Sequence, residues 1–331
     1  MSVNQTLAEL SDILVYSSMV TLTISMVLFS IALAKGRRLE SIQDSAQRNN
    51  SASANVRMGS TLTLEVPAVS TSVEQGAGRR AGNIGMSIMW LTTLLLGSAL
   101  ITRGISAQRL PWGNMYEFSL AGGFAVIAAF CFLSIKRDLR WLGLFVSIPV
   151  LLNLGLATTV LYTESAPLVP ALRSYWLAIH VTAAIVCMGA FTVGALLSSL
   201  YLVAENAEKR VAANAPAKKA DALAKRLPSS DRLDLMSYRI HAFMFPLWTF
   251  AVIAGAIWAE AAWGRYWGWD PKETWAFITW IVYAAYLHAR ATAGWHGRKA
   301  AYVAIAGYLT ILFNYFVVNI YVQGLHSYSG I

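Results

Sequence analysis

Eight long apolar runs, separated by polar segments, account for most of the chain. Each run approaches the ~20 residues that an α-helix needs to cross a bilayer core of about 30 Å. The pattern therefore predicts an all-α polytopic integral membrane protein with about eight transmembrane helices. The expected spans are Ile13–Ala34, Ile84–Ile101, Phe118–Ile135, Trp141–Leu161, Tyr175–Val203, His241–Ala261, Thr274–Arg290 and Ala300–Val322.

Basic residues are distributed unevenly among the loops between these runs. The loops after the first, third, fifth and seventh runs hold 21 of the 26 Lys and Arg residues, and the alternate loops hold 5. The positive-inside rule places the basic loops in the cytoplasm. Both termini and the loop before the seventh run are then expected on the outer side of the cell membrane. The N-terminal segment lacks a basic region before its first apolar run, which favours a retained helix over a cleaved signal.

The chain divides into two parts by this pattern. Residues 1–83 hold the first transmembrane helix and a polar, basic cytoplasmic loop, and residues 84–331 form the main membrane domain. Within the first loop, the stretch 41–60 is polar and is expected to be flexible. The Ala- and Lys-rich stretch 204–226 suits a fluctuating helix on the membrane surface. We find no soluble domain and no internal repeat.

Composition agrees with a membrane protein. The 331 residues are 56% hydrophobic and 13% charged, with a mean hydropathy of +0.51. Soluble domains carry about twice that charged fraction. The net charge of +9 could indicate nucleic-acid binding, but the loop asymmetry explains it better, so we expect no nucleic-acid partner. Cys131 and Cys187 lie inside apolar runs without a CxxC pattern, so nothing favours a thiolate metal site.

Six of the twelve tryptophans lie within 23 residues, from Trp258 to Trp280. Two or three rings at that position would fit the aromatic belt of a membrane interface. Six rings exceed what anchoring needs, and Gly264 and Gly268 allow the backbone to turn tightly among them. Flat indole faces suit a flat, apolar, conjugated ligand. We interpret the stretch 258–280 as a ligand platform in an outer loop.

The charged residues of this stretch have a structural interpretation and a functional one. Asp270 followed by Pro271 and Glu273 predicts an N-cap, a first helical residue and a capping box. Capping is a more common role for such carboxylates than catalysis. The cations Arg265 and Lys272 fit an anionic ligand and lipid phosphate equally well.

Two of the five histidines share one level of the membrane. His180 lies about 9 Å below the outer start of the fifth predicted helix, and His326 lies just beyond the last one. They are therefore expected near the tryptophan loop, despite being 146 positions apart. Two imidazoles from distant segments at one depth are typical of the axial ligands of a haem iron.

The other three histidines differ in expected position. His288 lies about 21 Å below the outer start of the seventh helix, in the inner half of the bilayer. An ionisable residue at that depth is a functional candidate. His241 and His296 are expected at the inner interface, as polar residues without a ligand.

The residues from Trp263 to Trp280, WGRYWGWDPKETWAFITW, resemble the WWD signature of haem-handling membrane proteins. Four further segments are similar to the CcsA/ResC-type subunit of the System II cytochrome c synthase, which is called CcsB in actinobacterial naming. They are LPWGNMYEFSL around Asn114–Glu117, LRSYWLAIHV with His180, YLHAR with His288 and GLHSY with His326. The resemblance covers most of the chain from about Gly85 to Tyr328.

This resemblance implies a role in cytochrome c biogenesis. Haem b would enter from the cytoplasmic side, with His288 as one axial ligand and a CcsB/ResB-type membrane subunit supplying the other. It would then reach an outer site formed by His180, His326 and the WWD loop. There it would form thioether bonds with the CxxCH segment of apocytochrome c, and thiol-reducing proteins are further expected partners.

The resemblance makes the chain a subunit of the synthase and leaves open whether it is an enzyme by itself. No catalytic residue is assigned beyond the three histidines that would bind iron. The expected haem-binding set is His180, His288, His326, Trp258, Trp263, Trp267, Trp269, Asp270 and Trp275, with Arg173, Arg265 and Lys272 as candidates for the haem propionates.

Three other functions compete with this one. A b-type membrane cytochrome for electron transfer also uses paired histidines, usually within the bilayer. A transporter with an aromatic gate would show inverted repeats and broken helices, and neither is evident. A hydrolase is disfavoured because the sequence has no serine–histidine–acid or paired-carboxylate pattern.

Overall fold

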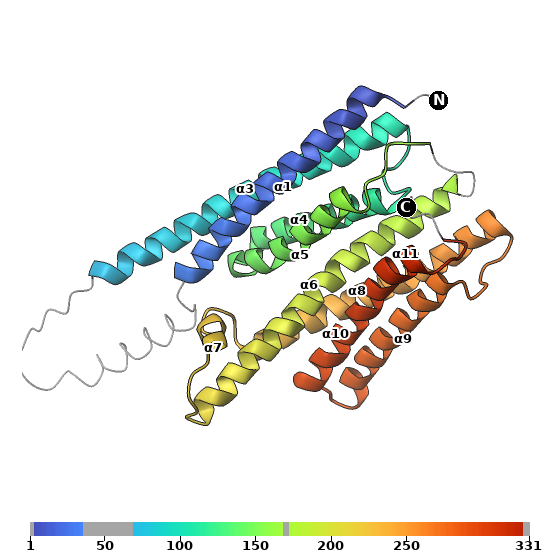
Figure 1. The fold of residues 1–331 in the computed structure, drawn as a ribbon. Helices are drawn as coiled ribbons and strands as arrows, with labels where there is room; N and C mark the ends of the chain where they lie inside the picture. Colours follow the sequence, from blue (N-terminus) through green and yellow to red (C-terminus); the bar gives the residue numbers. More distant parts are fainter. Residues whose placement is uncertain (1–2, 36–68, 168–171, 327–331) are drawn as a thin grey trace, which may run out of the picture.

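The computed structural model of the chain describes residues 3–35, 69–167 and 172–326 (Figure 1). In this part all regular structure is helical, which confirms the predicted fold class. The helices are α1 Gln5–Lys35, α3 Val69–Ala107, α4 Met115–Lys136, α5 Arg140–Thr159, α6 Tyr175–Ala212, α7 Lys219–Ala224, α8 Ser230–Trp263, α9 Pro271–Thr292 and α10 Arg298–Leu312, followed by the π-helix η2 Phe313–Val318 and by α11 Asn319–Tyr321.

Seven helices in the described part are long and apolar enough to cross a membrane, and α9 is not among them. Figure 1 nevertheless shows α1 beginning at the same end of the molecule at which α11 finishes. A chain with both ends on one side crosses an even number of times. The 22 residues of α9 measure about 33 Å, long enough to cross a bilayer core, and lie along α10, so α9 corresponds in length and position to the seventh predicted span.

Most helices extend beyond the apolar runs that predict them. The sixth run was expected to begin at His241, whereas α8 begins eleven residues earlier at Ser230. Polar residues at helix ends can remain helical outside the hydrocarbon core, where hydropathy no longer marks them. The Ala- and Lys-rich stretch 204–226 is divided between the end of α6, a turn and α7. The stretch 41–60 lies outside the described residues, and the boundary expected at residue 83 falls inside α3.

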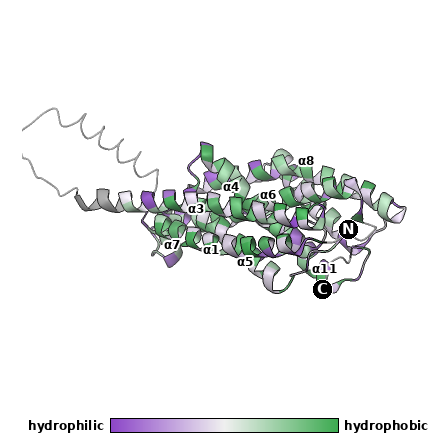
Figure 2. Ribbon diagram, turned by 90° about the horizontal axis from the view of Figure 1, so that it is seen from above, coloured by the Kyte–Doolittle hydropathy of each residue, from purple (hydrophilic) through white to green (hydrophobic). Residues whose placement is uncertain are grey.

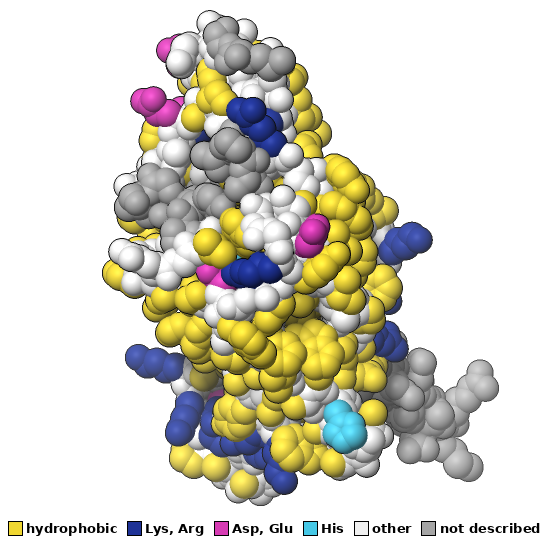
Figure 3. Space-filling model, turned by 90° about the vertical axis from the view of Figure 1, so that its right-hand side faces the viewer, with side chains coloured by type: hydrophobic (Ala, Val, Ile, Leu, Met, Phe, Trp, Pro, Cys, Tyr) yellow, Lys and Arg dark blue, Asp and Glu magenta, His cyan; other side chains and the backbone are white. Residues whose placement is uncertain are grey.

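Two groups of four helices make up the membrane part. Helices α1, α3, α4 and α5 pack together as the first bundle, and α6, α8, α9 and α10 form the second. Contacts between α4 and α6 join the two bundles (Figure 1). Green, the colour of hydrophobic residues, predominates along the helices in Figure 2, and Figure 3 shows hydrophobic side chains across the middle of one face, with Lys and Arg gathered toward its lower end.

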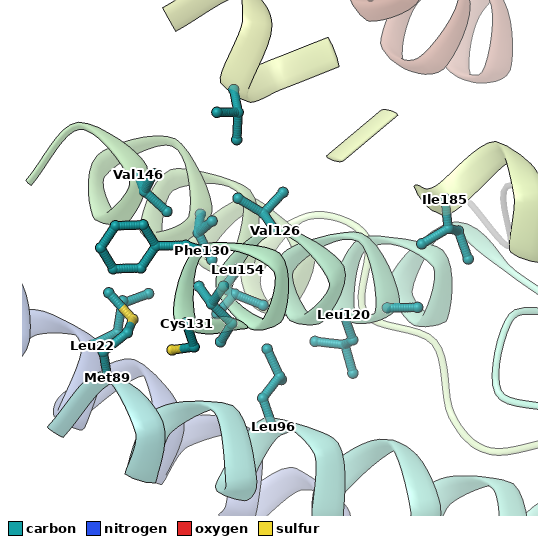
Figure 4. Packing of buried hydrophobic residues seen from close by; sticks show 14 of the residues in the cluster. Leu22, Met89, Leu96, Leu120, Val126, Phe130, Cys131, Val146, Leu154 and Ile185 are labelled. Carbon is teal, nitrogen blue, oxygen red and sulfur yellow. The ribbon is translucent and has the colours of Figure 1, made fainter. Parts of the chain in front are cut away.

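A heptad of small residues brings α1 close to α3. Ser11, Ser18 and Ser25 recur every seven residues of α1 and are fully buried. Ser11 and Ser25 donate hydrogen bonds of 2.8 Å to backbone carbonyls of α3. Small residues allow such close approach in membranes, where apolar burial against another helix gains little over lipid. Larger side chains, including Leu22, Met89, Leu96, Leu120 and Phe130, fill the centre of the first bundle (Figure 4).

A buried ionic network closes the end of this bundle near the start of α1. Arg103 and Glu117 are both fully buried, with 3.2 Å between Nε and Oε1. Glu117 also accepts two hydrogen bonds from Arg109, at 2.6 and 2.9 Å, and one from the Gly113 N–H at 2.8 Å. Asp12 of α1 contacts Arg103 on the other side. The network thus joins α1, α3 and the turn before α4.

Glu117→Ala is expected to lower the free energy of unfolding by about 3–5 kcal/mol, because the buried Arg103 guanidinium would lose its nearer carboxylate and keep only the 3.5 Å contact with Asp12. Unfolding of the detergent-solubilised protein by heat or denaturant measures the change. Asp138→Ala is the matched control, since its ion pair with Arg140 is partly exposed and is expected to contribute at most about 1 kcal/mol. Equal losses in the two variants would contradict the role given to the buried network.

Candidate ligand cavity between the two bundles

A cavity opens between the bundles at the end that carries the loop before α9. Its volume, counted with the space at its open mouth, is ≈ 1290 Å³. The first bundle contributes Trp112, Gly113, Asn114, Met115 and Phe118 to its lining. The second bundle contributes His180, Trp258, Trp267, Lys272 and His326 near the mouth. Trp248 also lines it, 15 residues before the end of α8, so the cavity reaches about 22 Å along that helix.

The two histidines expected to share one level do lie in one cavity. The ring centroid of His180 is 6.2 Å from that of Trp258, and the two planes are nearly parallel. The ring centroid of His326 is 5.5 Å from the same indole. Trp258 is itself buried, so it forms a fixed wall beside both imidazoles. The tertiary structure therefore brings together residues that α6 and the segment after α11 supply from distant parts of the chain.

Hydrogen bonds fix the tautomer of both imidazoles. The Nδ1–H of His180 donates to the carbonyl oxygen of Ala251 at 2.7 Å, and a carbonyl can only accept. The Nδ1–H of His326 donates to Oδ1 of Asp270 at 2.8 Å. Each Nε2 then carries a lone pair, and neither has a hydrogen-bond partner among the described residues. A histidine that binds a metal usually donates one ring N–H to an oxygen and keeps a free lone pair on the other nitrogen.

Two glycines allow these hydrogen bonds. A Cβ atom at Gly255 of α8 would lie 2.7 Å from Cε1 of His180. A Cβ atom at Gly324 would lie 2.6 Å from Oδ2 of Asp270. Real Cβ atoms do not approach so closely, so larger residues at these positions would push the imidazole and the carboxylate away.

Asp270 joins three segments at the mouth of the cavity. As predicted, it is the N-cap of α9, accepting from the Lys272 N–H at 3.1 Å, and Glu273 completes the capping box. It also accepts the Leu325 N–H at 2.7 Å and the His326 Nδ1–H. Burial alone would raise the pKa of Asp270, but the bonds from His326, Leu325 and Lys272 lower it to about 2. The carboxylate thus stays ionised and keeps His326 oriented.

The partly buried position of His326 affects its own proton. Burial lowers the pKa of His326 below its usual value, although Asp270 opposes this shift. The imidazole is therefore neutral at pH 7, which leaves the Nε2 lone pair available.

The predicted tryptophans occupy different positions. Trp263 lies 4.7 Å from the His326 ring, and Trp267 lines the cavity. Trp269 is mostly exposed, has a positive φ of 57° and contacts Trp267 edge-on. Trp275 does not line the cavity and packs on Phe313 of η2, with 4.0 Å between centroids. Trp258 and Trp267 therefore line the cavity, Trp263 contacts His326, and Trp269 and Trp275 lie outside the lining.

The three candidate anion-binding cations also differ. Lys272 lines the cavity, and its Nζ donates to Oδ1 of Asn319. No described carboxylate lies within ion-pair distance of this ammonium. Arg265 is engaged by Glu273 at 3.3 Å and lies over the Trp263 ring. Arg173 is exposed and does not line the cavity.

The remaining histidines lie elsewhere. His288 is exposed on α9, 17 residues after Pro271, or about 26 Å from the N-terminal end of the helix. His296 is exposed in the turn between α9 and α10. The expectation that His241 begins its helix is wrong. Because α8 starts at Ser230, His241 lies three turns inside the helix, fully buried against Phe191 and Tyr283.

Several lining residues were not predicted. Trp248 of α8 and Asn314 of η2 each have a buried polar atom, Nε1 and Oδ1, without a described partner. Asn314 of the π-helix and Asn319 of α11 both face Lys272. The Nδ2–H of Asn314 donates to the backbone carbonyl oxygen of Lys272 at 3.2 Å, and Oδ1 of Asn319 accepts from the Lys272 ammonium. The only sequence signal was polarity inside an apolar run, and hydropathy alone does not locate a π-helix.

Comparison with known proteins gives a consistent family. Residues 112–326 match the family model described as Cytochrome C assembly protein. The chain is 40% identical over 249 residues to the cytochrome c biogenesis protein CcsA of Guillardia theta, covering 72% of this chain and 81% of that protein. It is 38% identical over 248 residues to the CcsA of Chlamydomonas reinhardtii, covering 73% and 67%, and 35% identical over 299 residues to that of Picosynechococcus, covering 75% and 87%.

Asp270→Ala is expected to lower the free energy of unfolding at pH 7 by about 1–2 kcal/mol, through loss of the N-cap and of the tie to Leu325. The pKa of Asp270 is lower in the folded protein than in the unfolded chain, so its stabilisation is complete above about pH 4. It disappears as the pH falls toward 2. Unfolding midpoints of the wild type and the variant between pH 2 and 7 measure this convergence, and a constant difference across that range would contradict it.

Proposed function

Because the chain belongs to the family of cytochrome c assembly proteins, we propose that its cavity holds haem for covalent attachment to apocytochrome c. Membership in this family gives it a role in cytochrome c maturation. Haem is the cargo and substrate in this proposal. The cavity between the bundles is the outer site at which the cargo is presented.

The observation that carries the proposal is the state of the two imidazoles. His180 and His326 line one cavity, each with Nδ1–H bound to an oxygen and each with Nε2 free of any described partner. Both rings lie beside Trp258 in one cavity, as two axial ligands of one iron must. The buried His241 has the same bonding, with its Nδ1–H on the Ser237 carbonyl oxygen and Nε2 without a described partner, but it does not line this cavity, so the shared cavity is what sets His180 and His326 apart.

The rest of the lining suits a large apolar ring. Indoles of Trp258 and Trp267 and the aliphatic wall below them exclude water from a macrocycle. Lys272 provides one cation without a described carboxylate partner, and it is our choice for a propionate contact. Arg265 is a weaker candidate because Glu273 engages it, and Arg173 is weaker because it does not line the cavity.

The attachment step fits a site that binds and orients. Each cysteine thiol of a CxxCH segment adds across one haem vinyl group, so that a carbon–sulfur bond forms and the thiol hydrogen ends on the other vinyl carbon. The addition is redox-neutral, but it requires free thiols, which implies a thiol-reducing partner. The contribution of this chain is to hold the porphyrin by its two axial histidines while its edge meets the peptide.

His288 supports a second haem position within the membrane. Its side chain is exposed on α9 at a depth where water is scarce, and an ionisable group there needs a partner. We propose that a CcsB/ResB-type subunit covers this face and supplies the opposite axial ligand. The loops rich in Lys and Arg would then face the cytoplasm, with both termini and the cavity mouth outside.

His180→Ala and His326→Ala are each expected to lower the haem that copurifies with the full chain by about tenfold or more, because one axial bond is lost. Added imidazole should restore the six-coordinate absorbance spectrum by filling the space. His296→Ala is the matched control, since this exposed histidine lies at the other end. Full haem content in both cavity variants without imidazole would reject the outer site.

His288→Ala is expected to leave the spectrum of the outer site unchanged while removing a second haem signal from the complex with the partner subunit. Quantifying haem per complex before and after the substitution measures this separation. A His288→Ala complex with unaltered haem content would reject the inner site.

An electron-transfer cytochrome, the alternative function, would keep its haem when incubated with an apocytochrome bearing CxxCH and a thiol reductant.

A further inference from the structure

Two turns at the mouth of the cavity have the same construction. In the turn before α9, Arg265 pairs with Glu273 at 3.3 Å, the Gly268 N–H donates to Glu273 at 2.9 Å, and Asp270 caps the helix. Trp267, directly before the glycine, lines the cavity. One glutamate thus fixes the arginine, the glycine and the helix start together.

The turn before α4 repeats each of these contacts. Arg109 pairs with Glu117 at 2.6 Å, the Gly113 N–H donates to Glu117 at 2.8 Å, and Asn114 caps α4 by accepting the Glu117 N–H at 2.9 Å. Trp112, directly before the glycine, lines the cavity. The two segments, RLPWGNMYE and RYWGWDPKE, share the order Arg, Trp-Gly, Asn or Asp, and Glu, with one residue inserted at different points.

The two turns belong to different bundles. Helix α4 packs against α3, α5 and α6, whereas α9 packs against α8 and α10. All of the haem-binding residues predicted from the sequence come from the second bundle, between His180 and His326. Trp112 therefore approaches the cavity from the bundle that those residues do not include.

Trp112 also has an unused donor. Its ring is partly buried against the first bundle, and its Nε1 is buried without a hydrogen-bond partner among the described residues. A buried indole N–H without an acceptor is costly and usually finds a partner. Trp248, which lines the deeper part of the same cavity, has the same unpaired N–H. Ring and donor therefore both suit a ligand that fills the space between the bundles.

We propose that Trp112 is a cargo-contacting residue, and that the turn Arg109–Glu117 forms a second wall of the haem site, matching the wall that carries Trp267. This inference rests on the proposed function of the cavity. The haem then lies between the two bundles, with the axial histidines on one side and the Trp112 turn on the other. The first bundle takes part in binding and is more than a membrane scaffold.

Titration of the haem-free full chain in detergent with iron protoporphyrin IX tests the proposal. Trp112→Ala and Trp267→Ala are each expected to raise the dissociation constant by about tenfold, because each loses an aromatic wall. Trp112→Phe should lose less, since it keeps a ring and lacks only the N–H. Trp90→Ala is the control, because Trp90 belongs to the first bundle, packs against Phe132 and does not line the cavity.

Unfolding midpoints of the haem-free variants separate binding from folding. A Trp112→Ala midpoint close to that of Trp90→Ala, with weakened binding only in the former, supports the second wall. If Trp112→Ala does not fold, then weak binding by Trp112→Leu together with near-normal binding by Trp112→Phe supports it instead. Wild-type affinity in every Trp112 variant that folds, with Trp267→Ala and His180→Ala weakened, would overturn the second wall alone. Wild-type affinity in all of these variants would overturn the haem site itself.

Discussion

The carboxylate of Asp270 is the contact on which the candidate site most depends. Its two oxygens cap α9, accept the backbone N–H of Leu325 after α11 and accept the Nδ1–H of His326. One carboxylate therefore joins three segments. Burial of such a group without partners would be unfavourable, and its three donors offset that cost. Helix capping and orientation of a candidate ligand are therefore one interaction. The backbone at Gly324 lies so close to the Asp270 carboxylate that no side chain would fit at residue 324.

The position of the cavity follows from the division into two bundles. The first bundle is held by small residues between α1 and α3 and by the buried Arg103–Glu117 pair, and it meets the second through α4 and α6. Ligand sites commonly form where two such units meet, because packing there is incomplete. Each bundle brings one turn fixed by a glutamate to this boundary. The same arrangement, in which an arginine and a glycine N–H contact one glutamate, thus stabilises both sides of the cavity mouth.

Much of the fold could be predicted because membrane crossing constrains composition strongly. The eight apolar runs correspond to helices, and the DPKE stretch does begin α9 with Asp270 as its cap. Helix ends were less accurate, since residues beyond the hydrocarbon core are free to be polar and helical. His241 shows the consequence: hydropathy placed it at an interface, whereas the additional turns of α8 bury it among aromatic rings.

The sequence by itself determined the membrane class, the helix order, the tryptophan-rich loop and the common level of His180 and His326. These follow from local composition and from the fixed rise of a helix, which do not depend on neighbours. Only the tertiary structure decided which nitrogen of each imidazole is free, that Asp270 holds His326, that Trp275 packs away from the cavity, and that Trp112 belongs to it. Those features depend on contacts between segments far apart in the chain, and helix spacing along one segment does not specify which faces meet.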